Sequence, residues 1–307
     1  MSQDITNKIR VGVLRGGVDS CYKKSLTEGG NVIAHILENL SDKYKPVDIL
    51  IDTNGIWHVN GVPIEPEGIA GKVDVIWNTL HPNLSKVFKD LSIPIVGVNY
   101  LNFLSPDNRV MLEKHMKEIN VKMPRHLILP LYKEDIDGTK EKYATQKAKD
   151  VFEKFSSPWI VRPLVSDVSM GVHIANTFPE LVNAIMDGIK HNHGIVVEEL
   201  IIGKFASVHT LAGFRNKDIY SFPIIEKFSS LEKEKLIFIA QKIYEHIDTN
   251  DYLKTDLILH PTKGIYLSDI SSYPSLSEDS HLNQSCESVG AKTHHALASI
   301  LEASFSE

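Results

Sequence analysis

The sequence has little of what marks several protein classes. Only two of its 307 residues are cysteine, Cys21 and Cys286, which is too few for a disulfide scaffold and fits a reducing compartment. No apolar run approaches the roughly 20 residues of a membrane-spanning helix, and the first seven residues hold no apolar core of a secretion signal. Basic residues are outnumbered by acidic ones, 33 to 39, which argues against a broad electrostatic grip on nucleic acid. We therefore expect a cytoplasmic protein with neither a nucleic-acid nor a membrane partner.

What is present is ordinary globular composition. Apolar residues make up 42% and charged residues 23% of the chain, which excludes wholesale disorder. At about 150 residues per domain, the length predicts two or three domains that bury their cores without a structural metal. No short-period repeat occurs, so solenoids and propellers are excluded.

The first third of the chain alternates strand and helix patterns. β-rich runs over 9–15, 47–52, 73–77 and 93–98 are separated by longer patterns such as the helical one that ends near Asn39. Two Asn-Gly dipeptides in the segment 54–61 predict an additional hairpin. Such alternation predicts a mostly parallel sheet over residues 1–103.

Antiparallel patterns dominate the rest of the chain. Consecutive strands are expected over 206–213 and 219–225, and a hairpin over 252–260 and 264–270. Further segments are expected as a strand over 194–202 and as helices over 105–119, 140–155, 179–190, 232–246 and 291–301. The fold class predicted from the pattern is α/β followed by α+β.

Several residues have a chemistry that suits a phosphate or metal site. Gly16 and Gly17 follow the first strand, where backbone N–H groups can approach an anion; a glycine pair in such a turn can equally serve only its unusual backbone conformation. Asp256 and Asp269 lie on the two strands of one predicted hairpin, so their carboxylates can converge on a divalent cation. The alternative is that both are solvated acids at strand ends.

Three further positions carry charge or a titratable ring at strand ends. Arg162 closes an apolar strand before a loop of small residues and suits a phosphate clamp; a solubilising surface charge is the alternative. Glu198 and Glu199 end a strand and can accept from the amino group and sugar hydroxyls of a nucleotide, or simply form an acidic edge. His81 follows a strand at the edge where α/β sheets bind ligands, although a lone loop histidine is more often structural.

Taken in order, five motifs resemble the D-alanine–D-alanine ligase family of ATP-grasp enzymes. The motifs are IRVGVLRGG, NTLH, SPWIVRP, VVEELIIGK and KTDLIL…GIYLSDISSYPSLSEDS. The resemblance implies a Rossmann-like parallel-sheet domain over 1–103, then a two-lobed ATP-grasp region with a central lobe over 104–193 and a C-terminal lobe over 194–307. It implies ATP-dependent carboxylate–amine ligation through an acyl phosphate, as in formation of the cell-wall dipeptide of peptidoglycan. ATP and Mg²⁺ are the implied cofactors, a small amino acid the implied substrate, and a homodimer a possible assembly.

The resemblance also implies roles for individual residues. ATP contacts are carried over to Arg109, Arg162, Ser169, Glu198 and Glu199. Metal ligands are carried over to Asp256, Asp269 and Ser271, and catalytic or substrate-carboxylate roles to Lys254, Ser280 and His81. The loop that binds the first substrate corresponds to Gly16, Gly17 and Cys21.

Several of these positions depart from the family pattern. Cys21 stands where the family has a glutamate that holds the ammonium of the first substrate, and Phe205 where it has a glutamate that binds ribose. Arg109 and Arg162 replace lysines, a change that is not conservative at a phosphate site. Ser271 replaces an asparagine ligand.

These departures define the competing hypothesis. It is a catalytically impaired or inactive relative, a binding or regulatory protein that acts alone or with an active ligase, with weak nucleotide binding and little dipeptide formation. A nucleotide-binding oxidoreductase is disfavoured, because no Gly-x-Gly-x-x-Gly follows the first strand.

Overall fold

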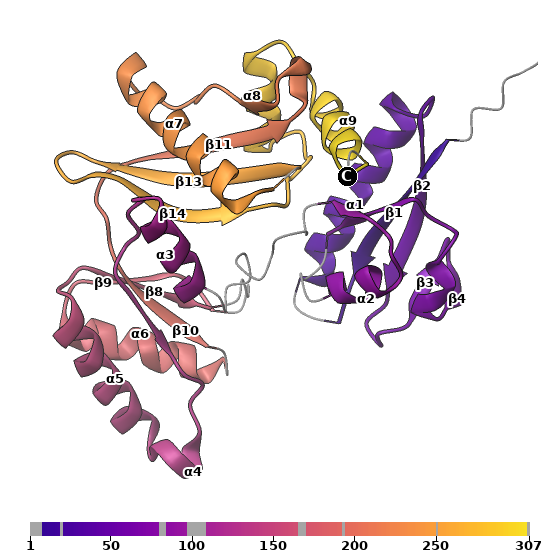
Figure 1. Cartoon of the computed structure of the whole chain (residues 1–307). Coiled ribbons are helices and arrows are strands. Elements are labelled where there is room, and N and C mark those ends of the chain that lie inside the picture. Colours follow the sequence, from indigo (N-terminus) through magenta and orange to yellow (C-terminus); the bar gives the residue numbers. More distant parts are fainter. Residues whose placement is uncertain are drawn as a thin grey trace, which may run out of the picture. The chain divides into compact units, whose positions relative to one another are not determined.

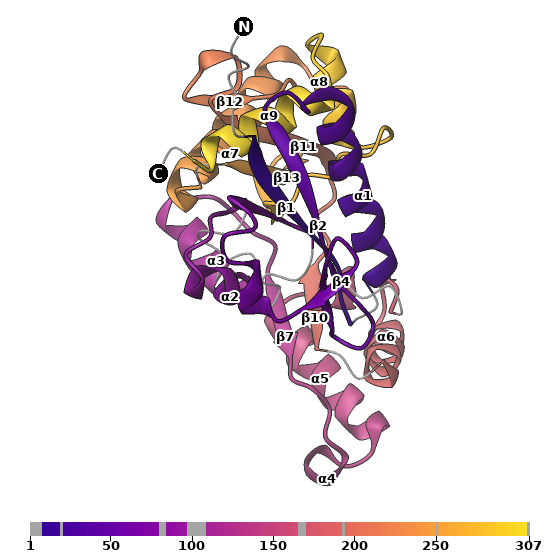
Figure 2. The same ribbon diagram turned by 90° about the vertical axis from the view of Figure 1, so that its right-hand side faces the viewer.

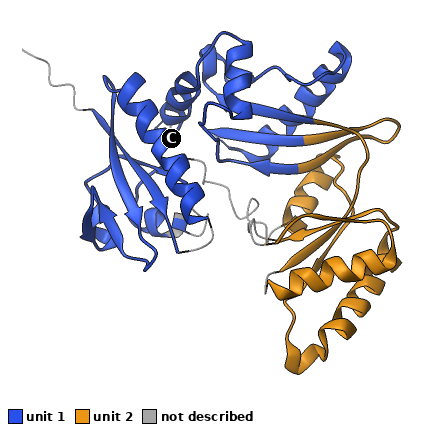
Figure 3. Ribbon diagram, turned by 180° about the vertical axis from the view of Figure 1, so that it is seen from behind, with its two compact units in different colours: residues 1–102, 206–256, 269–307 blue, residues 103–205, 257–268 orange. Residues whose placement is uncertain are grey.

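The computed structural model describes residues 8–18, 21–79, 84–96, 109–164, 170–191, 194–249 and 251–305. The chain divides into two compact units (Figure 3). Unit 1 comprises residues 1–102, 206–256 and 269–307, and unit 2 comprises residues 103–205 and 257–268. Among the helices of the described ranges, none is long and apolar enough to cross a membrane.

Unit 1 begins with a six-stranded sheet in the order β4-β3-β2-β1-β5-β6. Its strands are β1 (Ile9–Gly16), β2 (Tyr44–Ile51), β3 (Trp57–Val59), β4 (Val62–Ile64), β5 (Val75–Asn78) and β6 (Ile95–Val96). β1 pairs in parallel with β2 and β5, and β5 with β6, whereas β2, β3 and β4 are antiparallel neighbours. Both the predicted parallel sheet and the predicted hairpin are confirmed. The turn between β3 and β4 uses Asn60 and Gly61 at φ values of 48° and 82°, as a two-residue turn with both central residues left-handed requires.

Helix α1 (Tyr22–Asn39) runs alongside β1 and β2 (Figure 2). Its buried side includes Val32 and Ile36, which pack with Val11 and Val13 of β1. The 3₁₀ turn η1 (Pro66–Ile69) and the short helix α2 (Ser85–Asp90) complete this part of the chain. The apolar residues of α1 recur with the helical period because one side of the helix covers the sheet. This is why the sequence pattern predicts the helix.

The second sheet of unit 1 has the order β12-β11-β13-β14. Its elements are β11 (Lys204–Ala212), η4 (Phe214–Asn216), β12 (Ile219–Ser221), α7 (Ser230–Ile247), β13 (Tyr252–His260), β14 (Gly264–Ser271), α8 (His281–Ser288) and α9 (Thr293–Ala303). The strand expected over 219–225 ends at Ser221, since Pro223 has no N–H to donate to a ladder. Helix α8 was not predicted, although Ser280 caps it and Leu282 and Cys286 bury one of its sides in the core.

One hydrophobic core serves both sheets of unit 1. It joins Val32 and Ile36 of α1 to Leu297, Ile300 and Leu301 of α9, which are at most 1% exposed. Burial of apolar surface contributes about 25 cal/mol per Å² to the free energy of folding. A core shared by both sheets therefore stabilises their packing against each other. Residues more than 250 positions apart thus share a single frame.

Unit 2 contains an antiparallel sheet in the order β7-β10-β8-β9. Its elements are α3 (Arg109–Glu118), β7 (His126–Leu129), α4 (Glu134–Asp137), α5 (Lys140–Lys154), β8 (Trp159–Pro163), β9 (His173–Ala175), α6 (Phe178–Lys190) and β10 (Ile195–Glu199). Helices α5 and α6 lie side by side on the sheet (Figure 1). Thr139 and Thr177 cap them by accepting from the amides of Lys142 and Glu180, which explains where the two predicted helices begin.

Two adjacent glycines of α1 generate a matched test of helix packing. A Cβ on Gly29 would lie 2.8 Å from Cβ of Arg15, whereas a Cβ on Gly30 would meet nothing within 4 Å. We predict that Gly30→Ala raises the unfolding free energy by about 0.5–1 kcal/mol, because alanine restricts the unfolded chain. Gly29→Ala is expected to lower it, because α1 must move away from β1. Urea unfolding of both variants measures this, and equal effects would contradict the packing.

Candidate active site

Side chains on one side of the second sheet form a polar face. Because residues alternate along a strand, Tyr252, Lys254 and Asp256 of β13 point to one side. Ser207 and His209 of β11 point to the same side, since each bonds a β13 residue. The polar face therefore arises from period-2 placement of polar residues in two strands of unit 1.

Asp256 is held by one partner on each carboxylate oxygen. Ser207 Oγ donates to Oδ1 at 2.5 Å, and Lys254 Nζ donates to Oδ2 at 2.8 Å. Only 16% of the Asp256 side chain is exposed. Since a carboxylate oxygen has two lone pairs, the arrangement fixes the orientation of Asp256 and leaves acceptor capacity for a cation.

A row of hydrogen bonds extends from this face into the protein. His209 Nδ1 lies 2.7 Å from the Tyr252 hydroxyl, and His209 Nε2 lies 2.8 Å from His281 Nδ1. His281 Nε2 lies 3.2 Å from Glu226 Oε1, which also accepts from the Ser207 amide at 3.1 Å. We call Tyr252, His209, His281 and Glu226 the imidazole relay. Glu226, at the end of the relay, binds the backbone amide of Ser207, and the hydroxyl of Ser207 holds Asp256.

Burial governs the protonation of the relay. Desolvation, reinforced by the nearby charges of His281 and Lys254, holds the pKa of His209 well below its usual range. Burial likewise raises the pKa of the Tyr252 hydroxyl. At neutral pH, His209 is therefore an uncharged ring and Tyr252 an intact phenol.

The remaining site residues of the second sheet lie on β14 and at the start of α8. Asp269 is exposed on β14, and the Tyr273 amide donates to Ser271 Oγ at 3.3 Å. Ser280 Oγ caps α8 by accepting from the Asn283 amide at 3.1 Å. β14 is the neighbour of β13, so Asp256 and Asp269 stand on adjacent strands, as the hairpin prediction required.

The predicted substrate loop lies at the carboxyl end of β1, where strand order reverses between β2 and β5. Such switch points border the ligand crevice of open α/β sheets. Gly16 and Gly17 have φ values of 94° and 107°. Their amides donate to Ser25 Oγ at 3.0 Å and to the Ile51 carbonyl at 2.8 Å. The glycines thus supply a left-handed turn, and their N–H groups are used inside the fold.

Cys21 begins α1 as its N-cap residue, without a side-chain capping bond. Two turns further along the same side of the helix, Glu28 Oε1 accepts from Ser275 Oγ at 3.0 Å. This bond joins α1 to the loop between β14 and α8, within unit 1. The Ser275 hydroxyl therefore ties α1 to the loop before Ser280.

In unit 2, the two predicted phosphate-binding arginines share one carboxylate. Arg162 Nε donates to Glu198 Oε2 at 2.8 Å, and an Arg109 guanidinium nitrogen forms an ion pair with Glu198 Oε1. The side chains of Arg109 and Glu198 are only 6% and 8% exposed. Arg162 and Glu198 meet diagonally across β8 and β10, because Val196 is the direct partner of Arg162. The triad carries a net charge of about +1 when both arginines are ionised.

Glu199 has a different partner on the outer side of the sheet. Arg125 Nε donates to Glu199 Oε2 at 2.8 Å, and this hydrogen bond is the main cause that lowers the pKa of Glu199. The Arg125 side chain is 55% exposed. The two consecutive glutamates thus belong to one buried and one exposed ion pair.

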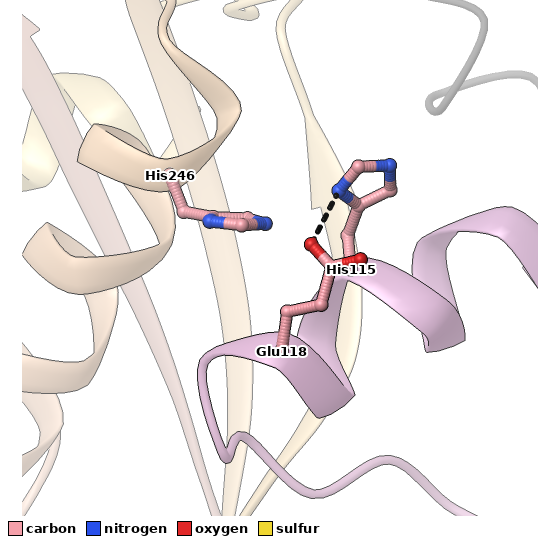
Figure 4. Close-up of side chains that lie close together, drawn as sticks. All are labelled: His115, Glu118 and His246. Carbon is pink, nitrogen blue, oxygen red and sulfur yellow. Dashed lines mark ion pairs between the residues drawn. The ribbon is translucent and has the colours of Figure 1, made fainter.

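Two predicted site residues, His81 and Ser169, lie outside the residues that the structure describes. A titratable pair that was not predicted lies on α3, where His115 Nδ1 is 3.5 Å from Glu118 Oε2 (Figure 4). Pairs three residues apart on a helix surface contribute about 0.2–0.5 kcal/mol. We interpret this pair as support for α3.

Ser207, His209, Glu226 and His281 were missed by sequence reasoning. The alternation of Ser207 and His209 with apolar residues along β11 was the available signal. It marks one face of a strand as polar. For Glu226 and His281, in a connection and in an unpredicted helix, no sequence pattern pointed to the relay.

With this geometry in view, comparison with known proteins gives a consistent result. No family model matches the sequence. The D-alanine–D-alanine ligase of Fervidobacterium nodosum is 24% identical over 87% of this chain and 80% of its own length. The D-alanine–D-alanine ligase B of Clostridium perfringens is 21% identical over 97% and 99%.

Solved structures agree in fold. The VanG D-Ala:D-Ser ligase of Enterococcus faecalis superposes with a TM-score of 0.75 at 16% identity, covering 97% of this chain and 99% of that one. The D-alanine–D-alanine ligase of Bacillus anthracis, solved with ATP, gives 0.74 at 19% identity and 97% coverage of both chains. The chain has the ATP-grasp fold, an α/β domain followed by an α+β region. Its sequence is similar to those of D-alanine–D-alanine ligases, at 24% and 21% identity, and its fold is that of solved ligases.

The two glutamates of β10 allow a matched test of buried against exposed ion pairing. We predict that Glu198→Gln lowers the unfolding free energy by about 3–5 kcal/mol, because Arg109 stays buried without its carboxylate. Glu199→Gln is the control and should cost less than about 1 kcal/mol, since its partner is exposed. Chemical denaturation measures both values, and an equal cost would contradict the buried triad.

The neutral His209 ring predicts a pH dependence of stability. In the unfolded chain a histidine binds a proton below about pH 6.5, whereas the folded protein resists it. The unfolded state therefore gains protons as the pH falls from about 6.5, and the free energy of unfolding decreases in that window. His209→Gln should reduce this decrease relative to the parent chain. Denaturant titrations at pH 7.5 and 5.5 give the comparison, and identical pH dependence in the variant would contradict it.

Proposed function

We propose that this protein is an ATP-dependent carboxylate–amine ligase of the D-alanine–D-alanine ligase type, which joins two small amino acids through an acyl phosphate. The observation that carries the proposal is the match along nearly the whole chain to proteins named as such ligases. The arrangement of Lys254, Asp256 and Asp269 on adjacent strands supports it. Production of a cell-wall precursor is the corresponding role.

The residues of the β13–β14 face fit a magnesium ion. Asp256, Asp269 and Ser271 offer only oxygen atoms, which Mg²⁺ prefers, and both oxygens of Asp256 are oriented by hydrogen bonds. When bound, Mg²⁺ would supply charge neutralisation for the phosphates of ATP. Lys254, next to Asp256, would stabilise negative charge that develops on the reacting carboxylate.

The basic groups of unit 2 are the phosphate contacts that the resemblance implies. Arg109 and Arg162 would contact phosphate oxygens, and Glu198 orients both guanidinium groups. Ligation chemistry is mostly positioning and charge neutralisation, so arginines fixed by a shared carboxylate suit it. Gly16, Gly17 and Cys21 would border the first amino acid, and Ser280 would bind the carboxylate of the second.

The ion pairs of Glu198 with Arg109 and Arg162 also fit the second hypothesis, a catalytically impaired relative that acts as a regulatory protein. Both guanidinium groups already have a carboxylate partner in the structure, which reduces their attraction for phosphate. A relative that binds ATP without turnover, as a regulatory protein, would have this property.

Turnover decides between the two functions. We predict that Mg²⁺, ATP and D-alanine together release phosphate, and that Asp256→Asn lowers the rate at least about 10²-fold, since it removes a charged group from the phosphate site. Asp218→Asn, an exposed carboxylate in the turn between β11 and β12, is the control and should leave the rate unchanged. Coupled phosphate assays with D-alanine and a panel of other amino acids measure this. ATP binding in calorimetry without amino-acid-dependent release would instead support the regulatory protein.

A further inference from the structure

The imidazole relay is connected by hydrogen bonds to the carboxylate of Asp256. Ser207 is held at both of its polar groups, because its amide donates to Glu226 Oε1 and its hydroxyl donates to Asp256 Oδ1. Ser207 and His209 are 4% and 2% exposed. The relay and the Asp256 carboxylate are therefore connected through a single buried serine.

Only one arrangement of protons satisfies the whole relay. Glu226, when ionised, only accepts, so His281 Nε2 carries the hydrogen between them. His281 then accepts at Nδ1 from His209 Nε2, and His209 accepts at Nδ1 from the Tyr252 hydroxyl. In the reverse direction the hydroxyl hydrogen of Tyr252 would have no acceptor among the residues that the structure describes. An unsatisfied buried donor costs about 1–3 kcal/mol, which favours the first direction.

We propose that the imidazole relay is a positioning network for Asp256, in which Glu226, fixed by the row of His281 and His209, holds Ser207, and Ser207 sets the orientation of the carboxylate that binds the metal–nucleotide complex. The proposal rests on the proposed function, since it concerns the same metal site. None of the four relay residues touches the nucleotide in this role. They act through Ser207.

The physical basis is the tolerance of metal sites. Productive sites need their groups placed within about 0.5 Å, and partners that hydrogen-bond a ligand carboxylate typically change metal affinity about 10- to 100-fold when they are removed. Asp256 has only Ser207 and Lys254 as its hydrogen-bond partners in the described chain. Loss of the serine hydroxyl leaves Oδ1 without its fixed donor.

A matched pair of variants on β11 tests the proposal. Ser207→Ala removes the hydroxyl that holds Asp256. Thr210→Val removes a comparable buried bond, between Thr210 Oγ1 and Ser221 Oγ at 3.0 Å, from the opposite face of the same strand. The measurement is Mn²⁺ affinity in the presence of a non-hydrolysable ATP analogue, by electron paramagnetic resonance, together with the unfolding temperature.

We expect Ser207→Ala to weaken Mn²⁺ affinity about 10- to 100-fold relative to Thr210→Val, with similar unfolding temperatures for the two. Glu226→Gln should weaken it in the same direction, although this residue does not touch Asp256. Equal Mn²⁺ affinities of Ser207→Ala and Thr210→Val would overturn the positioning role and leave the proposed function standing. A parent chain that binds no Mn²⁺ with the analogue would overturn both.

The proton arrangement has an independent readout. In ¹⁵N spectra of the parent chain, both His209 and His281 should carry hydrogen on Nε2, and His209 should carry none on Nδ1. A spectrum with hydrogen on Nδ1 of His209 would overturn the stated direction of the relay, and with it the way in which Glu226 is fixed.

Discussion

The apolar contact between α1 and α9 is the constraint on which the candidate site of unit 1 depends. Val32 and Ile36 of α1 share one core with Leu297 and Ile300 of α9. Because this core covers both sheets of unit 1, the turn at Gly16 and the polar face of β13 belong to one rigid frame. Glu28 of α1 accepts a hydrogen bond from Ser275 Oγ, and His35 bonds the Leu276 carbonyl, so these bonds add direction to a contact that is otherwise non-directional.

In each of the two units, charged groups are oriented by fixed partners. Asp256 receives one donor on each oxygen, and Glu198 is shared by two arginines. Buried charges require such partners, because an unpaired ion in the interior is costly. The forked donors of Arg109 and Arg162 suit a shared carboxylate, which a lysine's single ammonium would not match.

Much of the fold followed from local patterns. Alternation of strands and helices predicted the parallel sheet, and the Asn60-Gly61 dipeptide predicted the hairpin. Helix α8 escaped prediction because only Leu282 and Cys286 mark its buried side in an otherwise polar segment, and β12 ends early because Pro223 interrupts the ladder. The domain boundaries after residues 103 and 193 stay predictions, as do the roles of all candidate site residues.

By itself, the sequence determined the fold class, the resemblance to the ligase family, and the acidic pair Asp256 and Asp269, because periodicity and residue order are local properties of the chain. Only the tertiary structure decided which groups are partners. His209 and His281 are 72 residues apart, and Arg109 meets Glu198 from a helix outside the sheet. Hydrogen bonds and ion pairs depend on distances of about 3 Å, and packing of distant segments around a common core sets those distances.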